Sequence, residues 1–395
     1  MCGIVGYLGN ENYSNYIING LKLLQNRGYD SAGLSYLYEG SLKTHKYAST
    51  DNNNSIKLLE DSIDLHEESH LAIGHTRWAT HGPKNNINAH PHHDNNNMFS
   101  IVHNGIIENF QQLKEQLVKE NFVFHSQTDT EVIAVILGKY YAIHNNIEKA
   151  IECTVMQLQG TWALVIIHKD FPEQIWLTRN GSPLLLGIEE EFVLIVSEQL
   201  AFNNHIKSYI IIENHDIIHI KKTENKIEYN ENIKRYPIKT KLKDDIIIKP
   251  ENYEHWTLKE IMEQPDAIKR CTNNGGRIDD NISVKLGGLE QNKSRLLECE
   301  HAILLGCGTS YHSSLWSQEI FKSLDIFSTV HVFDGAEFDI KDIPKKGKTC
   351  ILLCSQSGET KDLHRCIHIA KEYDLPTIGV VNVVDSLIAR DTDCG

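Results

Sequence analysis

The end of the chain repeats one pattern, in which a short apolar stretch runs into a glycine- or serine-rich loop and then into a helix. Residues 301–305 lead into Gly306-Cys-Gly-Thr-Ser310, and residues 349–354 lead into Ser355-Gln-Ser-Gly-Glu-Thr360. Residues 377–381 begin a third repeat. Strands that alternate with helices pair as parallel neighbours, because each helix carries the chain back to the edge where the next strand starts. The pattern therefore predicts an α/β domain with a doubly wound parallel sheet.

The first part of the chain, residues 2–220, lacks this repeat and mixes many strands with a few helices. Alternating apolar residues predict a strand at 3–8, and helical spacing predicts a helix that ends before Gly28. Further strands are predicted at 71–73, 98–102, 162–167, 175–178, 192–196 and 209–212, and further helices around 110–117 and 132–136. This part is expected to be one α+β domain.

The chain has 395 residues, which exceeds the usual size of a single hydrophobic core. Residues 221–250 are charged, weakly periodic and closed by Pro250, which is typical of a connection between domains. We therefore expect a first domain at residues 2–220 and a second domain at residues 285–395. Residues 221–284 are expected to form a linker that contains a helix near 257–270. The Asn-rich runs 52–54 and 95–97 are expected in loops.

Charge and composition exclude several classes of function. The net charge is −14, with 39 Lys and Arg against 53 Asp and Glu, so we expect no broad basic surface for nucleic acid or anionic lipid. No run approaches the roughly 20 apolar residues of a membrane span, and the N-terminus lacks a signal-type segment. The nine cysteines include no Cys-x-x-Cys pair, which favours reduced thiols over disulfides or zinc. We expect a cytoplasmic protein.

Cys2 is the first candidate for chemistry. Removal of Met1 leaves a thiol beside a free α-amino group, whose ordinary pKa of roughly 7.7–8.0 lets it accept the thiol proton at neutral pH. One residue would then supply both the nucleophile and the base. The alternative is that Cys2 is only a small apolar residue at the start of a strand.

Further polar residues suit the recognition and hydrolysis of glutamine. Arg77 offers a planar bidentate donor for an α-carboxylate, and Asp129 offers an acceptor for an α-ammonium group. The Asn104 amide and the Gly105 backbone N–H could stabilise an oxyanion, at about 3–4 kcal/mol per donor. Each residue also has a simpler interpretation, with Arg77 in a surface ion pair and Asn104-Gly105 in a hairpin turn.

Five motifs occur in a fixed order and resemble those of the N-terminal-nucleophile glutamine amidotransferases. They are Cys-Gly-Ile-Val-Gly from Cys2, His-Thr-Arg-Trp-Ala-Thr-His-Gly at 75–82, Asn-Ala-His-Pro-His at 88–92, His-Asn-Gly-Ile-Ile-Glu-Asn at 103–109 and Thr-Asp-Thr-Glu at 128–131. The resemblance implies an αββα sandwich with Cys2, Asn104 and Gly105 as catalytic residues. It also implies a glutamine site that contains Arg77, Trp78, Thr80, His81, His90 and Asp129.

The roles of Trp78 and the histidines have alternatives. The resemblance implies that Trp78 gates a passage for ammonia, whereas a tryptophan is more often core packing. His81, His90, His92, His93 and Asp94 look locally like a metal cluster. The family pattern places His81 and His90 in the site without a metal, and we expect no metal and no other cofactor.

The two serine loops predict a site for a phosphorylated sugar. Backbone N–H groups and helix N-termini after parallel strands attract phosphate, and hydroxyl groups add donors. The expected residues are Thr309, Ser310, Ser355, Gln356, Ser357 and Thr360. The alternative is ordinary helix capping by Ser310, Ser357 or Thr360. Both loops resemble those of sugar isomerase domains.

The whole chain, including His-Trp-Thr-Leu-Lys-Glu-Ile-Met-Glu-Gln-Pro at 255–265, resembles the glutamine:fructose-6-phosphate aminotransferase family. The resemblance implies transfer of ammonia from glutamine to fructose 6-phosphate to form glucosamine 6-phosphate, the first step of hexosamine synthesis, in a homodimer. That family carries a second sugar isomerase domain, so we expect glutaminase activity without sugar amination from these 395 residues alone.

Other functions are disfavoured by their missing motifs. Gly-Gly-Leu-Glu at 287–290 lacks the serine and aspartates of the asparagine synthetase ATP loop, and the acidic loop of the purine-pathway phosphoribosyl enzyme is absent. A different alternative is a sugar-phosphate-sensing regulator with an inactive glutaminase domain. It is disfavoured because Cys2 and the residues expected around it are all present.

Overall fold

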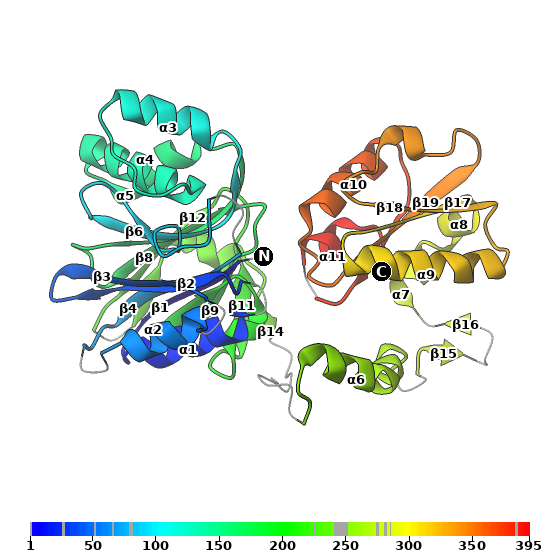
Figure 1. Ribbon diagram of the computed structural model, residues 1–395, viewed down its shortest axis with the longest axis horizontal. Helices are drawn as coiled ribbons and strands as arrows, with labels where there is room; N and C mark the ends of the chain where they lie inside the picture. The colour runs from blue at the N-terminus through cyan, green and yellow to red at the C-terminus, as the bar shows by residue number, and fades with distance from the viewer. Residues whose placement is uncertain are drawn as a thin grey trace. The chain divides into compact units, whose positions relative to one another are not determined.

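The computed structural model describes the chain except residues 1, 26–27, 51–52, 65–66, 79–81, 225, 241–251, 274–275, 280–282, 285 and 384–385. The chain forms two compact units, Met1–Ile248 and Lys249–Gly395 (Figure 1). No helix in the described ranges combines the length and the apolar character needed to cross a bilayer.

The described part of the first unit contains two antiparallel sheets. The larger has eight strands in the order β14-β11-β9-β10-β1-β4-β2-β3, and the smaller has six in the order β13-β12-β8-β7-β6-β5. The strands are β1 Gly3–Gly9, β2 Ser31–Tyr38, β3 Ser41–Ala48, β4 Leu71–Arg77, β5 His92–His93, β6 Phe99–Ile107, β7 Gly160–His168, β8 Gln174–Asn180, β9 Leu185–Ile188, β10 Phe192–Val196, β11 Ser208–Ile211, β12 Ile217–Lys222, β13 Ile227–Tyr229 and β14 Lys239–Thr240.

Helices cover the outer faces of both sheets (Figure 1). One apolar cluster joins the larger sheet to α1 and α2, a second lies between the two sheets, and a third joins the smaller sheet to α3, α4 and α5. The helices are α1 Ser14–Leu23, α2 Ser55–Ser62, α3 Phe110–Lys119, α4 Asp129–His144 and α5 Ile147–Val155, with 3₁₀ turns η2 Gln199–Phe202 and η3 Glu231–Arg235. The expected αββα sandwich is confirmed.

Strand β1 shows why the order of layers follows from sequence. Ile4 and Leu8 belong to the cluster between the sheets, whereas Val5 and Tyr7 belong to the cluster under α1. All seven residues of β1 are buried, because helices or strands cover both faces of the sheet at this point. The strand therefore holds the start of the chain rigidly against β4 and β10.

The first unit extends further along the chain than the sequence pattern indicates. Strand β12 continues past residue 220, and β13 and β14 lie within the segment 221–250 that was expected to connect the domains. Strands β13 and β14 are short edge strands at the ends of their sheets, where charged residues can face solvent. The charged residues Glu228 of β13 and Lys239 of β14 interrupt the apolar pattern from which a strand is predicted.

The second unit is built on a parallel sheet in the order β18-β17-β19-β20. Ile303 and Leu305 of β17 pack with α10 and α11, whereas Ala302 and Leu304 pack with α8 and α9. Helices thus cover both faces, and the expected doubly wound sheet is confirmed. The elements are α6 Trp256–Cys271, β15 Ile278–Asp279, β16 Ser283–Val284, α7 Gly287–Gln291, α8 Lys293–Leu297, β17 Cys299–Gly306, α9 Thr309–Ser323, β18 Thr329–Asp334, η4 Ile340–Asp342, β19 Lys348–Ser355, α10 Lys361–Glu372, β20 Thr377–Val381 and α11 Leu387–Asp391.

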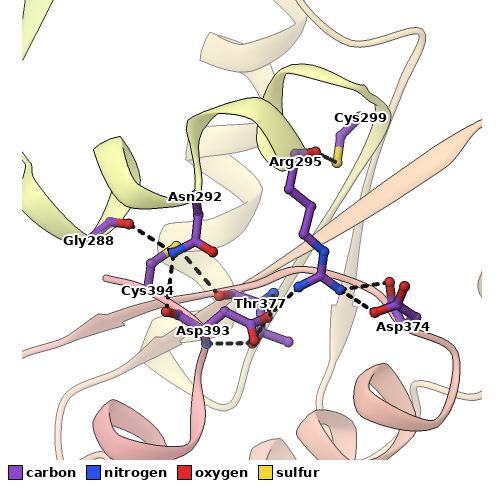
Figure 2. A network of polar contacts seen from close by, with 8 residues as sticks. All are labelled: Gly288, Asn292, Arg295, Cys299, Asp374, Thr377, Asp393 and Cys394. Carbon is purple, nitrogen blue, oxygen red and sulfur yellow. Dashed lines mark hydrogen bonds and ion pairs between the residues drawn. The ribbon is translucent and has the colours of Figure 1, made fainter.

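A polar network holds the residues after α11 beside β20 (Figure 2). Arg295 of α8 lies 2.6 Å from Asp374 Oδ1 and 3.5 Å from Asp393 Oδ2. The Asp393 carboxylate also accepts hydrogen bonds from the backbone N–H and the hydroxyl of Thr377, at 2.8 and 2.9 Å. Cys394 then pairs with Ile378 as a parallel bridge. The network joins a helix, a strand and the following segment into one body.

The cluster between the two sheets should contribute strongly to the stability of the first unit. Ile195 is fully buried there, and Ile195→Ala removes apolar contacts and leaves a cavity, so we expect a loss of about 2–5 kcal/mol in the free energy of unfolding. Urea unfolding followed by hydrogen exchange of first-unit peptides measures it. The matched control is Ile143→Ala, whose side chain is 62% exposed and which should change stability by less than about 0.5 kcal/mol. Equal effects of the two substitutions would contradict the proposed layer order.

Candidate active site

Cys2 lies directly before β1, beside the residue that follows β4. Strands β1 and β4 are antiparallel, with Gly3 opposite Thr76, so the start of one strand meets the end of the other. The Cys2 Sγ atom accepts a hydrogen bond from the Trp78 backbone N–H at 3.2 Å and lies 3.5 Å from the Trp78 carbonyl oxygen. Burial raises the pKa of the Cys2 thiol, while the hydrogen bond to Trp78 and the charge of Arg77 lower it.

The Trp78 side chain is 43% exposed and meets the ring of Tyr29 edge-on at 5.1 Å between centroids. The alternative that Trp78 is core packing is therefore wrong. Its backbone holds the thiol, and its indole is available at the surface of this unit.

Asn104 and Gly105 lie inside β6, so the hairpin-turn alternative is wrong. Asn104 Nδ2 donates a hydrogen bond to the Cys2 carbonyl oxygen at 3.0 Å, which joins the smaller sheet to the larger one. Gly105 has φ +136°, and a Cβ atom there would come within 2.0 Å of the Thr161 carbonyl oxygen. Only glycine fits this position without displacing β7.

Arg77 and Asp129 are both buried near Cys2. Arg77 is 3% exposed, which makes the surface ion-pair alternative wrong. Burial lowers the pKa of Arg77, and the charges of Cys2, Asp30 and Asp129 oppose that shift. Asp129 is the first residue of α4, where a negative charge is favourable, and its Oδ2 accepts a hydrogen bond from the Ile107 N–H at 2.9 Å. The structure thus brings a cation and an anion close to the thiol.

Four histidines, three of them in the quoted motifs and His93 directly after one, are held neutral by burial. Burial lowers the pKa of His75 to about 3 and that of His93 to about 4, and it lowers the pKa values of His90 and His92 well below the ordinary range. His90 Nδ1 lies 3.1 Å from His75 Nδ1, and His92 Nε2 lies 3.1 Å from Thr128 Oγ1. Each histidine is therefore part of a local hydrogen-bond network.

Within the described ranges, no group of three His, Cys, Asp or Glu side chains is placed to hold a metal ion. The Asp94 carboxylate instead accepts hydrogen bonds from the backbone N–H groups of Asn96, Met98 and Phe99. His93 lies 2.9 Å from Thr44 Oγ1. Thr80 and His81, which were expected in the glutamine site, lie outside the described residues.

Sequence reasoning assigned no role to His75 and His103, although both begin quoted motifs. His75 Nε2 lies 3.0 Å from Asn104 Oδ1, and His103 Nδ1 lies 2.9 Å from Thr130 Oγ1 in α4. Their positions in the motifs were the only signal in the sequence.

The two serine loops of the second unit follow neighbouring parallel strands. Thr309 and Ser310 follow β17, and residues 355–360 follow β19, which pairs with β17. The chain continues from β17 towards β18 on one side and from β19 towards β20 on the other, so these loops flank a topological switch point. Crevices at such points are the usual ligand sites of doubly wound sheets.

The serine hydroxyl groups of the second loop accept hydrogen bonds from backbone N–H groups within the loop. Ser355 Oγ accepts a hydrogen bond from the Gly358 N–H at 2.9 Å, and Ser357 Oγ accepts one from the Glu359 N–H at 3.3 Å. Helices α9 and α10 both begin without a side-chain cap. The helix-capping alternative for Ser310, Ser357 and Thr360 is therefore wrong, and the helix N-termini keep their positive potential.

Comparison with known proteins agrees with both units. A glutamine amidotransferase domain family matches residues 59–237, and the SIS domain family matches residues 295–395. In fold, the chain is similar to the solved glutamine phosphoribosylpyrophosphate amidotransferase of B. subtilis, with a TM-score of 0.51, 18% identity, and coverage of 96% of this chain and 81% of that one. The fold and site define a glutamine amidotransferase domain followed by a SIS domain.

Similarity over the whole chain indicates which proteins with these two domains are most like it. The chain is 41% identical to a probable glutamine–fructose-6-phosphate aminotransferase (isomerizing) of Acanthamoeba polyphaga mimivirus, and 35% identical to the corresponding enzyme of Pyrococcus horikoshii. Both alignments cover 100% of this chain and 64% of the relative. Over its whole length the chain is thus similar to glutamine–fructose-6-phosphate aminotransferases, and it spans 64% of the length of these relatives.

The buried neutral histidines should make the first unit sensitive to acid. Their folded pKa values lie below the ordinary value of about 6.5, so the unfolded chain binds more protons as the pH falls. Stability is therefore lost from about pH 6.5 downward, by about 2 kcal/mol per histidine between pH 7 and pH 5. Urea unfolding of the wild type and of His92→Gln at both pH values measures this loss. The variant should lose about 2 kcal/mol less than the wild type over this range, and an equal loss would contradict the prediction.

Proposed function

We propose that the first unit hydrolyses glutamine with Cys2 as the nucleophile, and that the whole protein transfers the ammonia to fructose 6-phosphate. The observation that supports this most directly is that Cys2, which precedes β1, lies close to Arg77 of β4, Asn104 of β6 and Asp129 of α4. Nucleophile, oxyanion donor, cation and anion are the four components that hydrolysis of an amino-acid amide requires.

In the proposed reaction, removal of Met1 exposes the Cys2 α-amino group, which takes the thiol proton. The Cys2 Sγ atom then forms a bond to the side-chain carbonyl carbon of glutamine, and the Asn104 amide and Gly105 N–H stabilise the oxyanion. Collapse of this intermediate breaks the C–N bond, and the amine leaves as ammonia with the proton from the α-amino group. Water hydrolyses the thioester and releases glutamate.

The two charges near the thiol support an assignment of the groups that recognise the substrate. We assign the glutamine α-carboxylate to Arg77 and the α-ammonium group to Asp129. We also assign His90 and Trp78 to the glutamine site, and Thr80 and His81 on the resemblance of their motif alone. The exposed indole of Trp78 supports its proposed role at the exit for ammonia.

We assign the sugar phosphate to the two loops at the switch point of the second unit, through Thr309, Ser310, Ser355, Gln356, Ser357 and Thr360. Two uncapped helix N-termini at neighbouring strand ends support this assignment. The product would be glucosamine 6-phosphate, made by the whole protein in the cytoplasm as a homodimer. We also propose that the glutaminase function resides in residues 2–240 and that the SIS domain lies within 285–395.

The regulator alternative has less support. A glutaminase domain that has lost its activity no longer needs its nucleophile or its oxyanion donors. In this chain both are present, and Asn104 donates a hydrogen bond to Cys2.

The nucleophile can be tested by covalent labelling. A glutamine analogue with an electrophilic diazoketone side chain should add once, and intact mass with peptide mapping should place the adduct on a Cys2 that has lost Met1. The control is Cys153→Ala, which removes another partly exposed thiol and should leave the labelling unchanged. A chain that retains Met1 and stays unlabelled would contradict the proposal.

The binding role of Arg77 predicts a specific kinetic change. Arg77→Lys keeps the charge but loses the bidentate geometry, so KM for glutamine should rise about tenfold or more with a smaller change in kcat. Ammonia release at varied glutamine concentrations measures both constants. Arg295→Lys, at the surface of the second unit, is the matched control and should leave both constants unchanged. An unchanged KM in Arg77→Lys would refute the role of Arg77.

A further inference from the structure

The orientation of the Asn104 side chain is determined by two fixed neighbours. One end of the amide lies 3.0 Å from the carbonyl oxygen of Cys2, which can only accept a hydrogen bond. That end must therefore carry the NH₂ group. The other end, Oδ1, lies 3.0 Å from His75 Nε2 and needs a donor there.

The same reasoning determines the tautomer of His75. Its Nε2 atom also lies 3.0 Å from the backbone carbonyl oxygen of His103, which again can only accept. A neutral imidazole has one proton, so that proton must be on Nε2, between two acceptors. The Nδ1 atom of His75 is then an acceptor. His90 Nδ1 lies 3.1 Å from this atom and 3.0 Å from Nε2, so the His90 ring packs against the His75 ring.

These contacts form a chain in which each group orients the next. The His90 ring packs against His75, His75 Nε2–H donates to Asn104 Oδ1, and Asn104 Nδ2 donates to the Cys2 carbonyl. His75 is fully buried and Asn104 is 8% exposed. Bulk water does not reach His75 to replace its N–H, so loss of this donor would leave Asn104 Oδ1 without its partner.

We propose that His75 is a positioning residue for glutamine hydrolysis, because its Nε2–H holds the Asn104 amide with the NH₂ group facing Cys2. This inference rests on the proposed role of Asn104 as an oxyanion donor. The two ends of an asparagine amide have nearly the same shape, so without His75 only the Cys2 carbonyl opposes a 180° turn of the amide. A turned amide presents an oxygen to the developing negative charge, which is worse than presenting no donor.

Two substitutions of His75 with nearly equal polarity distinguish a role in positioning the Asn104 amide from a general role in stabilising the fold. In His75→Gln, the side-chain nitrogen can occupy the place of Nε2 and donate to Asn104. In His75→Asn, the shorter side chain reaches only the place of Nδ1. We expect kcat for ammonia release to fall about 100-fold or more in His75→Asn, as for loss of an oxyanion donor, and to be largely retained in His75→Gln. KM for glutamine should change by less than about threefold in both, because Arg77 and Asp129 are untouched.

The link to Asn104 is tested by a double-mutant cycle. If His75 acts through Asn104, His75→Asn should cost almost nothing in an Asn104→Ala background. Equal kcat values for His75→Gln and His75→Asn, or additive losses in the cycle, would overturn the inference. His93→Gln, which replaces a histidine of the same cluster that bonds to Thr44 and Phe99, is the matched control and should keep kcat.

The outcome distinguishes this inference from the proposed function. A wild-type chain that releases ammonia, with His75→Asn equally active, overturns the positioning role and leaves the glutaminase proposal intact. A wild-type chain that has lost Met1 and releases no ammonia from glutamine overturns both. The pH values at which kcat rises and falls should be the same in His75→Gln as in the wild type, because His75 positions a donor and transfers no proton.

Discussion

The hydrogen bond from Asn104 to the Cys2 carbonyl oxygen is the contact on which the candidate active site depends, because its partners belong to different sheets. Cys2 precedes β1 of the larger sheet, and Asn104 lies in β6 of the smaller one. The apolar cluster between the sheets sets their separation, and packing at native density allows little freedom in it. The geometry around the thiol is therefore a consequence of core packing.

Burial has opposite consequences for the groups around Cys2. It raises the pKa of the thiol, which makes a nearby base necessary, and it lowers the pKa values of the histidines, which makes them unsuitable as charged groups but reliable as neutral donors. The Cys2 α-amino group is the proposed base for this reason. The histidines, by contrast, orient other groups.

Much of the fold followed from apolar periodicity. The strand at β1 was predicted from alternating apolar residues. Those at β7 and β10 and in the second unit were predicted from short apolar runs, since strands buried on both faces read as continuous apolar runs. The edge strands β13 and β14 were missed, since most of their residues are exposed to solvent and each strand contains a charged residue. Strand β3, also at an edge, carries lysines for the same reason.

The sequence by itself determined which chemical groups are available: a thiol at the second position, the Arg77 and Asp129 charges, an Asn-Gly pair and two serine loops, in an order that resembles one family. Only the tertiary structure decided how they are used. It placed Asn104 inside a strand and turned its amide towards Cys2 through His75. These contacts join residues 29 and 102 positions apart, and local periodicity carries no information about pairs so distant in the chain.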